Sequence, residues 1–216
     1  MSVLALIRHG QARPFEKDSD RLTEVGEQQA RELGAYWVQR GVKWTQAWCG
    51  TLERQRRTAE IVAECYRAAG HAFPALQQSD AFNEYAIHIS PAALEAVQQA
   101  QPAGRNRIFQ SLIEQAMFDF MMTPAFEEFH QRVTNGLQLL MDAAPSQSRI
   151  ALFTSGGPIG VAMQSVLKAP PPQAIEINWR VRNGSVTEFL FSGTKVSLDS
   201  FNTIPHLDDK HLQTFR

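Results

Sequence analysis

Cysteine is scarce in this sequence. The 216 residues contain only Cys49 and Cys65. Two cysteines are too few for a disulfide framework, and this pair lacks the close spacing of metal-binding cysteines. The usage fits a reducing compartment, so we expect a cytoplasmic protein in which both thiols are simply buried.

Long apolar runs are also missing. The N-terminal stretch MSVLALI is apolar, but it has neither the basic start nor the length of a secretory signal peptide. No run approaches the roughly 18 apolar residues that a membrane-spanning helix requires. We therefore expect a soluble protein that has no membrane partner.

The sequence also lacks an excess of charge of one sign. The formal net charge is -1, from 21 Lys and Arg against 22 Asp and Glu. Nucleic acids attract basic surfaces, so binding to them would need a local basic patch. The one concentration of basic residues is Arg54, Arg56 and Arg57. We expect no nucleic-acid partner.

What the sequence does contain is an alternation of strand-like and helix-like segments. Short apolar runs typical of strands occur at 3–7, 46–50, 149–153, 185–191 and 195–202, with a weaker one near 75–82. Helical periodicity occurs between Thr23 and Gly41, at 52–70 after Thr51, and at 157–168. Thr23 and Thr51 are candidate N-caps. The alternation predicts an α/β three-layer sandwich, with a mostly parallel central sheet flanked by helices.

Polar residues gather where the predicted strands end. RHG (8–10) follows the first strand, a helix with Arg54 in its first turn follows the second, and TSGG (154–157) ends the fourth. Glu84 follows the weaker strand. Ligands in such folds bind beyond the carboxyl ends of the parallel strands. Arginine matches phosphate oxygens and helix N-termini present free N–H groups to anions, so this set predicts a phosphate site.

The order of these segments is informative. LIRHGQA, LTEVGEQQA, TLERQRRTA, FNE and TSGG together resemble the histidine phosphatase superfamily, also called the phosphoglycerate-mutase-like family. The resemblance extends over nearly the whole chain, and the first three motifs in this order are specific. It implies phosphoryl transfer through a histidine, a small phosphorylated substrate as partner, and no metal or other cofactor.

The resemblance also implies roles for single residues. His9 matches the histidine that is transiently phosphorylated, and Arg8 and Arg54 match arginines that hold the phosphoryl oxygens. Glu84 matches the acid that protonates the leaving oxygen and later helps to activate water. Two nearby guanidinium charges are expected to lower the pKa of His9 and leave it neutral, as a nucleophile must be.

Three glycines belong to the same pattern. We expect the backbone at Gly10 and Gly156 to contact the phosphate, since both lie at the predicted site. Gly50 replaces the serine of the family pattern S-x-L-x-R-x-x-x-T-A, which is expected to cost a minor contact at most.

Ser155 departs from the family pattern. The fourth strand of the family ends in a motif like V-S-H-G, and its histidine falls on Ser155 here. We expect Ser155 to contact the phosphate as a shorter, neutral donor, not to act as a nucleophile, because G-x-S-x-G is absent. Losing one preorganised donor costs about 2.7–4 kcal/mol. His88 and His206 are candidates to fill the gap, and the position is expected to have room for an imidazole.

Residues 91–143 read as helices, broken at QPAG and at Pro124. This stretch is too short for its own core, so we expect a single domain over residues 1–216 with a helical insertion over the active site. The insertion carries a Phe- and Met-rich stripe: Phe109, Met117, Phe118, Phe120, Met121, Met122, Phe126 and Phe129. We interpret the stripe as core packing; an apolar wall over the site and a homodimer surface are the alternatives.

Three functions are compatible with these motifs. The first is a phosphatase that hydrolyses a phosphomonoester through phosphorylated His9, with low activity if Ser155 weakens the pocket. The second is a catalytically impaired member that binds a phosphorylated ligand or a protein partner. The third is a phosphomutase, which is disfavoured because RHGQARP lacks the serine, tryptophan and asparagine that follow RHG in the glycolytic mutases.

Overall fold

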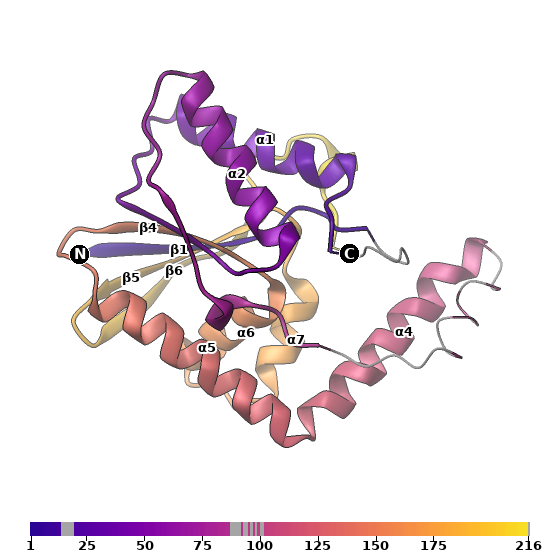
Figure 1. Cartoon of the computed structure of the whole chain (residues 1–216). Helices are drawn as coiled ribbons and strands as arrows, with labels where there is room; N and C mark the ends of the chain where they lie inside the picture. Colours follow the sequence, from indigo (N-terminus) through magenta and orange to yellow (C-terminus); the bar gives the residue numbers. More distant parts are fainter. Residues whose placement is uncertain are drawn as a thin grey trace. The chain divides into compact units, whose positions relative to one another are not determined.

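The computed structural model describes residues 1–13, 20–86, 92, 95, 97, 99 and 102–215. It divides into two compact units (Figure 1). The first unit comprises Met1–Glu84 with Arg132–Arg216, and the second comprises Tyr85–Gln131. Among the helices of the described residues, none is both long and apolar enough to span a membrane.

The first unit is built on one six-stranded sheet. Its strands are β1 (Ser2–Arg8), β2 (Gln46–Cys49), β3 (Leu76–Gln78), β4 (Arg149–Thr154), β5 (Val186–Ser192) and β6 (Lys195–Thr203), in the order β3-β2-β4-β1-β5-β6. Four strands are parallel, and β5 and β6 close the sheet in antiparallel pairing. β1 and β4 are almost completely buried, as parallel strands covered on both faces must be. The predicted α/β fold with a mostly parallel sheet is confirmed.

Helices cover both faces of this sheet. They are α1 (Glu24–Gln39), α2 (Glu53–Ala68), α5 (Pro124–Asp142), α6 (Gly156–Leu167) and α7 (Gln173–Arg180), with short 3-10 turns η1 (Asp80–Phe82) and η2 (Lys210–Leu212). Figure 1 shows α1 and α2 on one face, with α6 and α7 on the other. The core under α1 and α2 includes Ile7, Leu33 and Phe153. The sequence interpretation missed α7, although its buried Ala174 and Ile175 follow the proline-rich turn directly.

The predicted ends of α1 agree with the structure. The Thr23 hydroxyl accepts a hydrogen bond from the Gly26 N–H at 3.0 Å, which caps the first turn. Gly41 follows the helix with φ of 63°, a left-handed conformation that glycine adopts without strain. The expected N-cap and the closing glycine are both confirmed.

The predicted N-cap of α2 is wrong. The helix begins at Glu53, and Thr51 instead exchanges two hydrogen bonds of 2.7 Å with the Asn83 side chain. The Glu53 N–H donates to the Asp20 carboxylate at 2.7 Å. A residue distant in sequence therefore supplies the cap, because its side chain reaches the free N–H of the first turn.

The second unit contains α4 (Pro102–Met121) and the first part of α5. α4 begins at Pro102, so residues 102–104 of the predicted break at QPAG are helical and Gln101 lies outside the described residues, whereas Pro124 begins α5 as expected. Tyr85 stacks on Phe120 at 4.6 Å between ring centroids and meets Phe129 edge-on at 5.1 Å.

The Phe- and Met-rich stripe divides between buried and exposed positions. Met117, Phe126 and Phe129 are buried, which supports core packing, whereas Phe118 and Met122 are exposed. The Phe109 side chain lies outside the described part of the chain. The apolar wall over the site and the homodimer surface stay predictions.

Both cysteines belong to the first unit. Cys49 is buried, and burial raises the pKa of its thiol to about 12. Cys65 is half-buried, so the expectation of two buried thiols holds for Cys49 alone.

Candidate active site

The carboxyl ends of three parallel strands meet at one edge of the sheet. Arg8 of β1 lies opposite Thr154 of β4, and the His9 N–H donates to the Thr154 carbonyl at 2.9 Å. The Gly50 N–H, after β2, donates to the Phe153 carbonyl at 3.1 Å. His9 and Ser155 therefore directly follow two neighbouring strands, β1 and β4, at the edge of the sheet where the sequence predicted both residues.

His9 is buried, with 6% of its surface exposed. Its Nδ1 lies 2.7 Å from the Gly10 carbonyl oxygen, and the Arg54 Nε–H points at its Nε2 from 3.1 Å. Arginine can only donate, so Nε2 must be the acceptor and Nδ1 must carry the proton that is shared with Gly10. This tautomer leaves the lone pair of Nε2 as the nucleophilic one.

The pKa of His9 is lowered well below its ordinary value of 6.5. Burial is the largest cause, followed by the charges of Arg54 and Arg8, while the Gly10 carbonyl opposes the shift. The expected direction is confirmed, but burial contributes more than the arginines to which the sequence interpretation assigned it.

Neutral buried histidines make the stability of the fold depend on pH. Burial also lowers the pKa of His206, to about 4. The unfolded chain binds protons near pH 6.5 that the folded state excludes, so the free energy of unfolding should fall as the pH drops below 6.5. We expect a loss of about 2–3 kcal/mol between pH 7.5 and 5.5, measured by urea unfolding. Equal stability at both pH values would show that both histidines titrate normally.

Arg8 points toward the C-terminal segment. Its Nη1 donates to the Val181 carbonyl and, at 2.7 Å, to the Phe215 carbonyl. Its charge still acts on His9. Contact between Arg8 and phosphoryl oxygens stays a prediction.

Arg54 connects His9 to an acid that the sequence interpretation did not consider. Its Nη1 lies 2.5 Å from the Asp20 Oδ1, and its Nε approaches His9. The side chains of Arg54 and Asp20 are 18% and 34% exposed. The guanidinium is thus held between the candidate nucleophile and a carboxylate.

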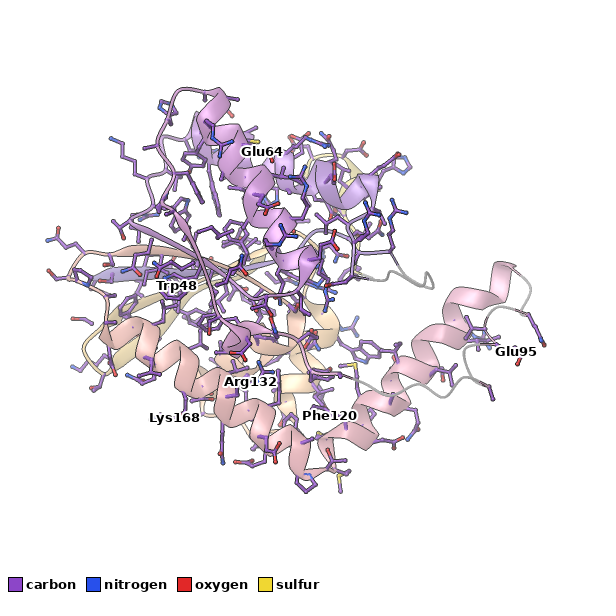
Figure 2. All side chains as sticks on the ribbon, in the orientation of Figure 1. Trp48, Glu64, Glu95, Phe120, Arg132 and Lys168 are labelled. Atoms are coloured by element: carbon purple, nitrogen blue, oxygen red, sulfur yellow. The ribbon has the colours of Figure 1, made fainter. Side chains whose placement is uncertain are left out.

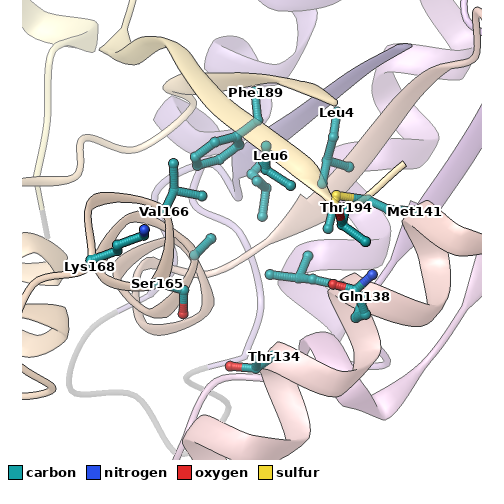
Figure 3. Close-up of a pocket in the computed structure, with 13 residues that line it drawn as sticks. Leu4, Leu6, Thr134, Gln138, Met141, Ser165, Val166, Lys168, Phe189 and Thr194 are labelled. Carbon is teal, nitrogen blue, oxygen red and sulfur yellow. The ribbon is translucent and has the colours of Figure 1, made fainter. Parts of the chain in front are cut away.

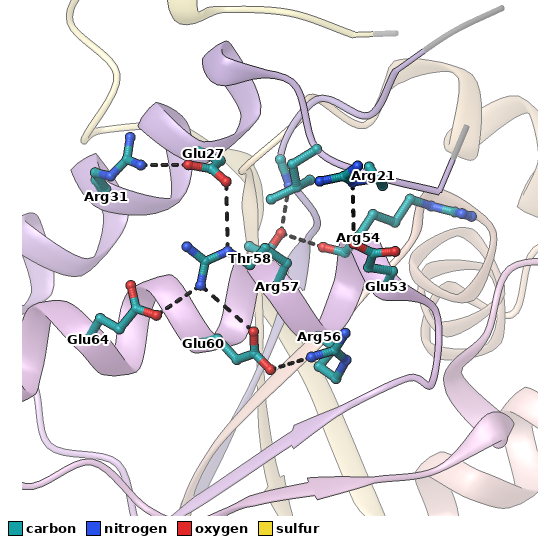
Figure 4. Close-up of polar contacts among 12 residues, drawn as sticks. Arg21, Glu27, Arg31, Glu53, Arg54, Arg56, Arg57, Thr58, Glu60 and Glu64 are labelled. Carbon is teal, nitrogen blue, oxygen red and sulfur yellow. Dashed lines mark hydrogen bonds and ion pairs between the residues drawn. The ribbon is translucent and has the colours of Figure 1, made fainter. Parts of the chain in front are cut away.

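The two arginines that follow Arg54 pair with acids on the helix surfaces (Figure 4). Arg56 lies 2.6 Å from Glu60. Arg57 lies 2.8 Å from Glu64 and 3.7 Å from Glu27. The arginine cluster of the sequence is therefore no unpaired basic patch.

Gly10 allows a close approach of two backbones. A Cβ at this position would lie 2.2 Å from the Gly26 carbonyl oxygen, so only glycine fits. The Gly10 N–H donates to the Thr58 hydroxyl at 3.1 Å, and that hydroxyl donates to the Arg54 carbonyl at 2.7 Å. In this structure the Gly10 N–H is occupied by Thr58, so its contact with phosphate stays a prediction.

A glutamine contacts Ser155. Gln55 and Ser155 are both fully buried, and the Gln55 Nε2 donates to the Ser155 Oγ at 2.8 Å and to the Phe82 carbonyl at 3.0 Å. A Cβ at Gly50 would lie 1.9 Å from the Gln55 Oε1 and 2.7 Å from the Asn83 Oδ1. A side chain at position 50 would therefore require Gln55 and Asn83 to shift, an effect that the sequence interpretation did not consider.

Gly50→Ser would introduce the serine that the resemblance expects at this position, but it should destabilise this protein. The new Cβ would force Gln55 out of its hydrogen bonds, at a cost of about 1–3 kcal/mol. Urea unfolding measures the loss, and adding Gln55→Ala should recover part of it. An unchanged unfolding midpoint for Gly50→Ser alone would contradict this packing.

Glu84 lies at the N-terminus of α6. Its Oε2 accepts a hydrogen bond from the Gly157 N–H at 3.0 Å, a favourable position for a carboxylate. Arg132 of α5, labelled in Figure 2, donates to the Asp80 carbonyl and, at 3.2 Å, to the Asn83 carbonyl. Its charge also acts on Glu84. Arg132 thereby holds the segment that leads to Glu84.

Gly156 is the first residue of α6, as expected for a phosphate-binding helix start. A Cβ there would lie 1.9 Å from the Asn178 Oδ1, so the position has no room for a side chain. Its contact with phosphate stays a prediction.

His206, predicted as a candidate to fill the gap at Ser155, is buried beside Tyr36 and Gly184. It lies 6.2 Å from the Tyr36 ring, and its Nε2 would be 3.7 Å from a Cβ at Gly184. The contact that the structure shows for the Ser155 hydroxyl comes from Gln55. His88 lies outside the described residues.

A cavity of about 250 Å³ is lined by Leu6 and Phe189 from the sheet and by Met141 of α5 and Val166 of α6, among others (Figure 3). None of the predicted site residues lines it. Within the described part of the chain, no group of three or more His, Cys, Asp or Glu could hold a metal ion. The candidate active site is therefore the strand-end cluster around His9.

Sequence reasoning missed four side chains of this cluster. They are Asp20, Gln55, Asn83 and Arg132. Each makes its contact across a long sequence separation, and Asp20 and Arg132 lie outside the recognised motifs. Gln55 and Thr58 lie inside the recognised segment TLERQRRTA and Asn83 lies inside FNE, so their positions in these segments were the available signal.

Comparison with known proteins gives the following matches. The family profile described as "Histidine phosphatase superfamily (branch 1)" matches residues 4–204. A phosphoserine phosphatase from Entamoeba histolytica, solved with 3-phosphoglyceric acid, is 19% identical with a TM-score of 0.66, covering 96% of this chain and 100% of that chain. A phosphoglycerate mutase from Bacillus anthracis str. Sterne is 16% identical with a TM-score of 0.66, covering 95% and 94%. No curated protein sequence matches the chain.

Proposed function

Because the chain belongs to the histidine phosphatase superfamily, branch 1, we propose that it hydrolyses a small phosphomonoester through a phosphohistidine formed on His9. The observation that carries the proposal is the state of His9, a buried and neutral imidazole whose Nε2 lone pair faces the Arg54 guanidinium. A histidine attacks phosphorus only when it is neutral. The similar structures include a phosphatase and a mutase, which supports phosphoryl transfer.

The first step forms the covalent intermediate. His9 Nε2 attacks the phosphorus atom, and the bond from phosphorus to the ester oxygen breaks as the P–N bond forms. Glu84, which must be protonated when the substrate is bound, gives its proton to the leaving oxygen, which departs as an alcohol. Arg54 and Arg8 offset the charge of the phosphoryl oxygens, which is the main need of a loose transition state.

The second step releases phosphate. Water attacks the phosphorus atom and gives a proton to the Glu84 carboxylate, which was formed in the first step. The P–N bond breaks, inorganic phosphate leaves, and His9 returns to its neutral form. The cycle consumes one water molecule, and both catalytic groups end in their initial protonation states.

Ser155 and Gln55 are proposed to fill the position that the second histidine occupies in the family. Both side chains are neutral and fully buried, and they bind each other. The pocket then has one cationic donor fewer than is usual in the family, which should slow hydrolysis roughly a hundred- to a thousandfold. This same observation favours the second candidate function, an impaired member that binds a phosphorylated ligand.

An assay on an aryl phosphate separates these functions. The phosphatase proposal expects release of inorganic phosphate with turnover, whereas the binding-only alternative expects phosphate affinity without release. Isomer exchange between phosphoglycerates would identify a phosphomutase. If the protein binds inorganic phosphate but hydrolyses none of several phosphomonoesters, the phosphatase proposal is refuted.

A further inference from the structure

We propose that Asp20 is an internal competitor of the substrate, whose carboxylate occupies at Arg54 the position that a phosphoryl group must take. The inference rests on the proposed function, because it assumes that Arg54 receives phosphoryl oxygens. Substrate binding then displaces a carboxylate that the chain itself supplies, and the two anions compete for the same donors.

Both oxygens of Asp20 are bound by donors that suit an anion. Oδ1 lies 2.5 Å from the Arg54 Nη1, and Oδ2 accepts the Glu53 N–H at 2.7 Å. The first donor is a guanidinium and the second is a free N–H in the first turn of α2. Guanidinium groups and helix N-termini are the donors that bind phosphate in proteins. The carboxylate therefore uses donors that a phosphoryl group would need.

Asp20 also determines where Arg54 points. The guanidinium is planar, so fixing Nη1 restricts the direction of the Nε–H as well. With Nη1 on Asp20, that Nε–H lies 3.1 Å from His9 Nε2 and engages the lone pair that must attack phosphorus. Arg54 has to leave His9 before the reaction. A phosphoryl group, which carries more charge than a carboxylate, can draw the guanidinium away from both partners.

The pair is accessible enough to exchange. Arg54 is 18% exposed and Asp20 is 34% exposed, so an incoming anion can reach both side chains. Ion pairs that solvent can reach contribute little net stability, so displacing Asp20 from Arg54 costs little free energy. Asp20 then selects for anions of higher charge, because a weaker anion displaces its carboxylate less readily.

The test is phosphate binding to the whole chain by calorimetry. Asp20→Asn keeps the shape of the side chain and an oxygen for the Glu53 N–H, but it removes the charge. We expect phosphate to bind roughly three- to tenfold more tightly. The KM for an aryl phosphate should fall by the same factor without a gain in kcat, since the lost competition affects binding. Asp20→Ala should shift both constants in the same direction.

Glu60→Gln is the matched control. Glu60 pairs with Arg56 on the same helix at 2.6 Å and is 35% exposed, which resembles the Asp20 pair without contact to Arg54. Phosphate affinity should change less than about twofold in this variant. An equal gain in Glu60→Gln would reduce the effect to general charge and overturn the inference.

Two results distinguish this inference from the proposed function. If Arg54→Ala abolishes phosphate binding while Asp20→Asn leaves it unchanged or weaker, Asp20 does not compete, and the phosphatase proposal survives. If neither the original protein nor Asp20→Asn binds phosphate, the phosphatase proposal and the competition by Asp20 are both refuted. Binding that appears only in Asp20→Asn would support the competition strongly.

Discussion

His9→Ala is expected to lower the kcat/KM for an aryl phosphate by roughly 10⁴- to 10⁶-fold, because it removes the atom that bonds to phosphorus. The same change should abolish the covalent intermediate. Rapid-quench with a radiolabelled phosphomonoester should trap label on the original protein that is stable in base and lost in acid, the behaviour of a phosphohistidine. The His9→Ala variant should carry none.

His206→Ala is the control for this experiment. His206 is a second buried histidine, and it packs on Tyr36 and near Gly184. Its loss should leave the trapped label in place, even if the fold is weakened. Label that persists in His9→Ala, or that disappears in His206→Ala with the fold intact, would mean that a different residue is the nucleophile.

Ser155→His is expected to destabilise the protein by about 1–3 kcal/mol and to leave the activity low, although it restores a family residue. The sequence interpretation expected room for an imidazole at this position. The structure contradicts that expectation, because Ser155 is fully buried and its Oγ lies 2.8 Å from Gln55 Nε2. Because Gln55 contacts the Ser155 hydroxyl, an imidazole at position 155 would have to displace Gln55.

Gln55→Ala combined with Ser155→His should make that space. The double variant then regains a donor that can carry charge, and its kcat/KM should exceed that of the single variant by up to about a hundredfold. Urea unfolding should show partial recovery of stability, since the crowding is relieved. Both readouts depend on the same pair of side chains.

Three results would contradict this account of the pocket. The first is a gain in kcat/KM for Ser155→His alone at unchanged stability, which would mean that Gln55 is no obstacle. The second is a double variant no more active than the single one. The third is a loss in Ser155→Ala as large as in His9→Ala, which would make the serine itself essential.

Several features of the fold could be predicted from the sequence because they depend on neighbours in the chain. The apolar runs of β1 and β4 identified buried parallel strands, and Thr23 and Gly41 marked the ends of α1. The motif order also identified the strand ends that carry His9 and Ser155. Local periodicity and caps are sufficient here, since each follows from spacing along one segment.

The sequence by itself thus determined the α/β architecture, the edge of the sheet where the site lies, and the candidate nucleophile His9. Only the tertiary structure decided what surrounds them. It placed Asp20 on Arg54, Gln55 against Ser155, and the Gly10 N–H on Thr58. These contacts join segments that are far apart in the chain, and burial, not a local pattern, is the largest cause of the lowered pKa of His9. The spacing of residues along the sequence does not predict such contacts, because only packing of the folded chain brings the partners together.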